Sequence, residues 1–131
     1  QGNFIPMIKV LKHLRSKSEI PVVSFFLECL LYAVPDYCYW GGPADYIQAV
    51  LQHIASRSAD DWYGQRLNTP SGDRDIFTGS EWTLDSWRRF HPFVPVWADF
   101  ARIANEWPDR DKSVEIWQQL LGADYFPASV S

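Results

Sequence analysis

A lysine, a serine and a phenylalanine near one helix junction could together hold a nucleoside triphosphate. Lys12 lies in a basic segment with helical spacing, and Ser24 and Phe25 follow a proline near the start of an almost wholly apolar segment. A lysine ammonium is a compact charge for a phosphate, and a hydroxyl near a helix N-terminus can donate to a phosphate oxygen. An aromatic ring can stack on a base. We therefore predict that these three residues bind a nucleotide.

The same three residues also fit an ordinary structural role. Lys12 could be a solvated flank of its helix, Ser24 a helix cap and Phe25 a core side chain. Caps and core aromatics are far more common than ligand sites, so the spacing alone favours the structural role. Nucleotide binding by these residues needs support from the rest of the chain.

Glu28 is an acidic residue inside the apolar segment that follows Ser24. A carboxylate is costly to bury without a partner, because it loses its hydration. We predict that Glu28 is a structural, buried carboxylate that pairs with a lysine or arginine of the first helix. Such a pair would fix the angle between the two helices.

Other catalytic patterns are missing from the sequence. It contains no phosphate-binding glycine-rich loop, no His-Glu-x-x-His, no Cys-x-x-Cys and no Gly-x-Ser-x-Gly. Three histidines lack the spacing of metal ligands and are predicted to serve the surface or the packing: His13, His53 and His91.

Two pairs of aspartates are the alternative candidates for a metal site. Asp60 with Asp61, and Asp73 with Asp75, lie in a polar, turn-rich segment. Acidic residues in such segments mostly serve turns and solubility. The sequence therefore predicts no metal site in this chain.

The composition indicates a folded domain without a membrane span. The chain has 131 residues, of which 47% are hydrophobic and 16% aromatic, so disorder is excluded. A net charge of −4 argues against a general nucleic-acid binder. Cys29 and Cys38 are predicted to be reduced core residues. No apolar run approaches the roughly 18 residues of a membrane span, and no secretory signal occurs, so we expect a cytoplasmic protein.

The spacing of apolar residues predicts an all-α domain, a compact bundle of about five helices. The expected helices cover residues 3–17, 21–33, 43–57, 93–107 and 110–121, with a short helical turn over 84–90. Asp109 should cap the last helix and Gly122 should end it. A long polar loop is expected over residues 58–80.

The predicted helices each have an apolar face. In the first helix it contains Met7, Val10, Leu11 and Leu14, at the spacing of one helix face. The faces of three later helices are expected to contain Tyr46, Ile47, Val50, Leu51 and Ile54; Val96, Trp97, Phe100, Ile103 and Ala104; and Val114, Trp117, Leu120 and Leu121.

The ordered set of segments resembles one family of enzymes. IKVLKHL at residues 8–14 and IPVVSFFLE at residues 20–28 look like the helical half of oligoadenylate synthase and cyclic GMP-AMP synthase-like nucleotidyltransferases. The bacterial members of this group are the CD-NTases of antiphage signalling. The end is similar as well, with FARIA at 100–104, IWQQLLG at 116–122 and YFP at 125–127.

This resemblance implies a two-lobed enzyme with the nucleotide, ATP or GTP, between its lobes. The family's triphosphate-contacting lysine falls on Lys12, its phosphate-binding hydroxyl on Ser24 and its base-stacking aromatic on Phe25. Family members often have tyrosine at the last position, so Phe25 keeps the stacking surface and loses the hydroxyl. The bacterial enzymes make cyclic di- or trinucleotides that activate an effector.

The resemblance also implies that the catalytic carboxylates and their Mg²⁺ belong to a preceding N-terminal lobe. This chain has no Gly-Ser followed by Asp-x-Asp. We expect residues 1–131 to be a single helical domain, the C-terminal lobe of a larger nucleotidyltransferase, unable to catalyse transfer alone and holding no cofactor itself.

Two other functions fit the same sequence. One is a helical protein-interaction module, which exposed Trp62, Trp82 and Trp87 would favour. The other is a catalytically inactive relative that only senses nucleotide or RNA.

Overall fold

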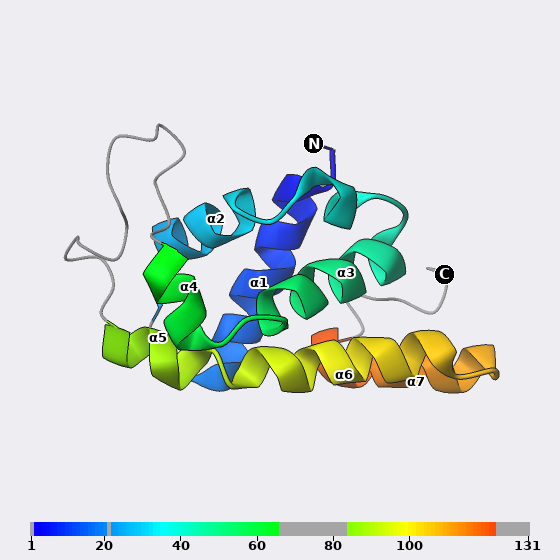
Figure 1. The fold of residues 1–131 in the computed structure, drawn as a ribbon. Helices are drawn as coiled ribbons and strands as arrows, with labels where there is room; N and C mark the ends of the chain where they lie inside the picture. Colours follow the sequence, from blue (N-terminus) through cyan, green and yellow to red (C-terminus); the bar gives the residue numbers. More distant parts are fainter. Residues whose placement is uncertain (1, 21, 66–83, 123–131) are drawn as a thin grey trace.

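Helices account for most of the described backbone (Figure 1). The computed structural model describes residues 2–20, 22–65 and 84–122. Within these ranges no strand occurs, which confirms the all-α fold class. The elements are α1 (Phe4–Ser18), α2 (Ser24–Tyr32), the 3-10 helix η1 (Asp36–Tyr39), α3 (Pro43–Ala55), α4 (Ala59–Gln65), α5 (Leu84–Phe90), α6 (Phe93–Glu106) and α7 (Arg110–Leu121).

The helix ends follow the local chemistry of the sequence. Pro43 is the first residue of α3, where its missing N–H costs no hydrogen bond. The Asp45 carboxylate accepts from the Gly42 N–H at 3.2 Å at the same helix end. Asp109 caps α7 by accepting from the Asp111 N–H at 3.1 Å, and Gly122 follows α7 with a φ of 84°. Both predicted ends of this last helix are therefore confirmed.

The helices pack around one continuous apolar core. α6 lies between α3 and α7, and α1 contacts α2, α3 and α7 (Figure 1). The predicted faces of α1, α3 and α7 are all buried. Cys29 and Cys38 are reduced and buried, as predicted. Among the described residues, no helix is long and apolar enough to cross a membrane.

The predicted face of α6 is wrong. Trp97 and Ala104 are buried as expected, but Val96, Phe100 and Ile103 are 53%, 37% and 38% exposed. The residues that face the core in their place are small or lie at other positions of the helix, namely Val94, Ala98 and Ala101. Because α6 is covered by α3 on one side and α7 on another, small side chains are needed where the backbones approach each other.

The predicted polar loop over 58–80 is also wrong in its first part. Residues 59–65 form α4, which is anchored by the fully buried Trp62. The second helix begins later than predicted, at Ser24, and Pro21 lies outside the described residues. With α4 and η1 included, the described ranges contain more helices than the five or so predicted.

Candidate functional site

The residues predicted to bind a nucleotide lie along the contact between α1 and α2. We call the surface formed by Lys12, Arg15, Ser24, Phe25 and Glu28 the α1–α2 seam. Lys12 and Arg15 are three residues apart on α1, and Ser24 and Glu28 are four apart on α2, so each pair shares one side of its helix. Arg15 contacts Ser24, and Lys12 faces Glu28. The helices therefore run antiparallel along this contact.

Lys12 and Glu28 form a loose ion pair across the seam. The Lys12 Nζ lies 4.0 Å from the Glu28 Oε2, and the two side chains are 37% and 43% exposed. The predicted pairing of Glu28 with a cation of the first helix is confirmed. The predicted burial is wrong, because Glu28 lies at the edge of the helix contact and its apolar sequence neighbours turn inward in its place.

Arg15 is the residue of the seam that sequence reasoning missed. Its Nη1 donates to the Ser24 Oγ at 3.0 Å and to the Val22 carbonyl oxygen at 2.9 Å. The signal in the sequence was its position one turn after Lys12, on the same side of α1. Spacing within one helix could not reveal that this guanidinium reaches the start of α2.

Ser24 and Phe25 lie at the beginning of α2. Ser24 is the first residue of this helix and half-buried, and the residue before it, Val23, makes no capping hydrogen bond through its side chain. Phe25 is 39% exposed, so its ring is partly accessible from solvent rather than enclosed in the core. The structure thus brings a lysine, an arginine, a hydroxyl and an aromatic ring to one surface. Their role in nucleotide binding stays a prediction.

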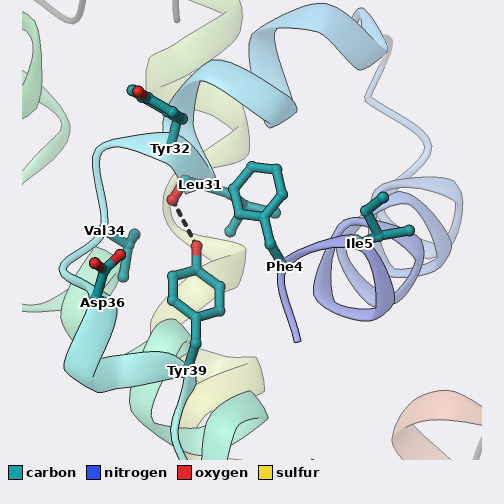
Figure 2. Close-up of a pocket in the computed structure, with 7 residues that line it drawn as sticks. All are labelled: Phe4, Ile5, Leu31, Tyr32, Val34, Asp36 and Tyr39. Atoms are coloured by element: carbon teal, nitrogen blue, oxygen red, sulfur yellow. Dashed lines mark hydrogen bonds between the residues drawn. The ribbon is translucent and has the colours of Figure 1, made fainter. Parts of the chain in front are cut away.

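A pocket of about 530 Å³ lies at the opposite end of the same two helices (Figure 2). Neither Lys12, Ser24 nor Phe25 lines it. Its wall is mostly apolar, with one carboxylate and one buried hydroxyl, and consists of Phe4, Ile5, Leu31, Tyr32, Val34, Asp36 and Tyr39. The Tyr39 hydroxyl donates to the Leu31 carbonyl oxygen, and burial raises the pKa of this phenol well above its usual range. Tyr39 is therefore a structural hydrogen-bond donor that stays protonated.

The three histidines are buried or partly buried among the helices. Burial lowers the pKa of both His13 and His53, with a smaller contribution from Lys17 and Arg57 respectively. His91 is buried, with its Nε2 3.3 Å from the Ile54 carbonyl oxygen. Within the described ranges, no group of three or more histidine, cysteine or acidic side chains is arranged to hold a metal ion.

Asp60, one of the alternative metal ligands, forms an ion pair with an arginine. Its Oδ1 accepts from the Arg88 Nε at 2.8 Å, and this hydrogen bond lowers the pKa of the Asp60 carboxyl. The pair links α4 to α5 on the surface. Asp73 and Asp75 lie outside the described residues. The Asp60 carboxylate is therefore paired with a cation in this structure.

Two of the three tryptophans that would favour a protein-interaction module are not on the surface. Trp62 and Trp87 are both fully buried, and Trp82 lies outside the described residues. The Trp62 Nε1 donates to the Ile54 carbonyl oxygen at 2.8 Å, and the Trp87 Nε1 donates to the Ala59 carbonyl oxygen at 2.7 Å. These two side chains hold α4 and α5 to the core.

Comparison with known families assigns the chain to a class. Residues 1–94 match the family described as the cGAS/DncV-like nucleotidyltransferase C-terminal helical domain, and the chain belongs to this family. Membership implies nucleotide substrates and a catalytic domain on the N-terminal side. No curated protein and no solved structure matches the chain at a significant level. The matched residues include the whole α1–α2 seam and the pocket of Figure 2.

Proposed function

We propose that this chain is the nucleotide-binding helical lobe of a bacterial nucleotidyltransferase that makes cyclic oligonucleotide second messengers in antiphage defence. In this proposal ATP or GTP lies between the helical lobe and the catalytic lobe. Lys12 and Ser24 bind the triphosphate, and the ring of Phe25 stacks on the base.

The observation that carries the proposal is the arrangement of the seam. Family membership makes a nucleotide the expected ligand, and the antiparallel contact of α1 and α2 places Lys12 opposite Glu28 and Arg15 opposite Ser24, the first residue of α2. Arg15 contacts the hydroxyl of Ser24 at the N-terminal end of that helix, where the helix dipole also favours an anion, and Lys12 lies on the same side of α1, one turn before Arg15. Phe25 follows directly in the sequence and is partly exposed.

The chemistry of transfer belongs to residues outside this seam. Mg²⁺ bound by carboxylates of the catalytic lobe would supply the charge that stabilises the leaving pyrophosphate. The helical lobe would hold the triphosphate and the base in place for that reaction. Such positioning lowers the entropic cost of the reaction without any bond forming on this chain.

Titration of the 131-residue chain with ATP, followed by amide NMR shifts, tests the proposal. The shifts should concentrate around Lys12, Ser24 and Phe25. Lys12→Ala should weaken ATP binding by about tenfold or more, because a hydrogen bond to a charged group contributes about 1.5–3 kcal/mol. The melting temperature should change little, since Lys12 is 37% exposed and its ion pair is loose.

Lys112→Ala is the matched control, because Lys112 is an exposed lysine of α7 that also pairs with a glutamate. It should leave ATP affinity unchanged. Equal affinities of the native chain and Lys12→Ala would contradict the assignment of Lys12. An inactive relative that senses nucleotide would pass this binding test, so the full-length protein must also be assayed for oligonucleotide synthesis. Synthesis that fails with intact binding would favour the inactive relative.

A further inference from the structure

Arg15 makes a contact that the proposed function does not use. One nitrogen of its guanidinium, Nη1, lies 2.9 Å from the Val22 carbonyl oxygen and 3.0 Å from the Ser24 Oγ. Arg15 is on α1, whereas both acceptors belong to the segment that enters α2. The two hydrogens of this nitrogen are sufficient for the two bonds.

The contact determines the direction in which the Ser24 hydroxyl can donate. A hydroxyl has one hydrogen and two lone pairs, and an arginine can only donate. The Ser24 Oγ must therefore accept from Arg15, which leaves its single hydrogen pointing away from the guanidinium. An anionic oxygen on the outer side of the seam is the group that such a hydrogen would reach. The positive charge of Arg15 polarises the hydroxyl further and strengthens its donation.

Arg15 also supports the backbone at the start of α2. Val23 makes no capping hydrogen bond through its side chain. The bond from Arg15 to the Val22 carbonyl oxygen fixes the backbone immediately before the helix. Arg15 consequently sets the position of the Ser24 hydroxyl both directly and through the backbone that carries it.

We propose that Arg15 is a positioning residue of the triphosphate site, acting through Ser24 rather than by contact with the phosphates. The inference rests on the proposed function, because it concerns the same site. It makes a specific claim about energetic coupling. Loss of Arg15 should matter for nucleotide binding only while the Ser24 hydroxyl is present.

A double-mutant cycle on the 131-residue chain tests this claim, with ATP and adenosine as the two probes. Arg15→Met keeps an unbranched apolar stem and the helix propensity of the side chain and removes its donors. Arg15→Met and Ser24→Ala should each weaken ATP binding by about tenfold, the typical effect of one charge-assisted hydrogen bond. The double variant should bind ATP no more weakly than Ser24→Ala alone. Adenosine, which has no phosphate, should bind all four proteins equally.

Each result decides between named alternatives. Additive losses of ATP affinity would mean that Arg15 acts on the phosphates directly, and would overturn the positioning role. A lower melting temperature with unchanged ATP affinity would mean that Arg15 only holds the helices together, and would also overturn it. Lys112→Met controls for the loss of one positive charge on an exposed surface.

The outcome for Lys12 separates this inference from the proposed function. If Lys12→Ala weakens ATP binding and Arg15→Met does not, only the inference fails. If the native chain shows no Lys12-dependent ATP binding, the proposed function fails and the inference fails with it. Should Arg15→Met unfold, Arg15→Gln, which retains a donor without the charge, should give an intermediate ATP affinity in the folded chain. Native affinity of Arg15→Gln would then overturn the inference.

Discussion

The ion pair of Lys12 and Glu28 contributes little to holding α1 and α2 together. Lys12 and Glu28 are both more than one third exposed and 4.0 Å apart, so their pair stabilises the fold by at most about 1 kcal/mol. The helices are joined by fully buried apolar side chains, Leu11 and Leu14 on α1 and Leu27 and Leu30 on α2. Lys12 is therefore available to bind an anion without loss of the fold.

Glu28 should compete with a nucleotide for Lys12. Its carboxylate repels a triphosphate and attracts the ammonium that the triphosphate would use. Glu28→Gln should therefore tighten ATP binding by up to about fivefold, equivalent to about 1 kcal/mol for an exposed pair. The gain should shrink in high salt, because surface charges are screened. ATP titrations at low and high ionic strength measure both effects.

The control for this prediction is Glu115→Gln, which removes an exposed carboxylate paired with Lys112 on α7. It should leave ATP affinity unchanged at both salt concentrations. Weaker binding by Glu28→Gln would show that Glu28 orients Lys12 for the nucleotide rather than competing with it.

At this scale the sequence predicted which types of residue meet but not how deeply they are buried. The pairing of Glu28 with a cation of the first helix follows from the cost of an isolated carboxylate in an apolar segment. Whether that carboxylate lies in the core or at the rim depends on the rotation of α2 against α1. The same rotation decides that Arg15 reaches Ser24, which explains why periodicity within α1 could not show it.

The corner between α3 and α4 is held by one backbone carbonyl that receives two side-chain donors. The Ile54 carbonyl oxygen accepts from the Trp62 Nε1 at 2.8 Å and lies 3.3 Å from the His91 Nε2. Both rings are buried. This carbonyl is near the end of α3, where the last carbonyls of a helix lack partners within the helix itself. Trp62 and His91 thus satisfy a helix end inside the protein.

Trp62→Phe should destabilise the chain through this hydrogen bond. Phenylalanine keeps an aromatic ring in the core and removes the indole donor, so we expect a loss of about 1–3 kcal/mol in the free energy of unfolding. Urea unfolding measures the loss. Trp40→Phe is the matched control, because Trp40 is 67% exposed, and it should change the free energy by less than about 0.5 kcal/mol. Equal effects of the two variants would contradict the structural role of Trp62.

Helices whose bounds depend on local sequence signals were predicted correctly, whereas those that depend on tertiary contacts were not. α5 matches its predicted bounds and α7 matches its predicted caps, because these rest on local signals. α4 is only seven residues long and was hidden, since helices this short depend on tertiary contacts such as those of Trp62. The apolar face of α6 was predicted wrongly because alanines such as Ala98 and Ala101 contribute little to an apolar pattern. These two small residues are nevertheless the ones that permit close packing.

At the scale of the whole molecule, the family match and the core have different boundaries. The match ends at residue 94, the second residue of the fourteen-residue helix α6. The apolar core continues past that point without a break, through Trp97, Ala101 and Ala104 to Trp117 and Leu121. α6 packs against α3, whose buried face lies within the matched part. The structure therefore indicates one folding unit that is longer than the matched region.

A chain shortened to residues 1–94 should fail to fold cooperatively, because α3 would lose its cover by α6. In the 131-residue chain, Ala101→Asp tests the same packing, because it places a charge at a fully buried position of α6. It should cost about 3–5 kcal/mol or more in the free energy of unfolding, since the carboxylate has no partner there. Ile103→Asp, at a neighbouring position that is 38% exposed, should be tolerated far better. Circular dichroism during thermal unfolding measures all three. A cooperative transition for residues 1–94, or equal stability of the two aspartate variants, would contradict the view that α6 completes the core of the family's helical domain.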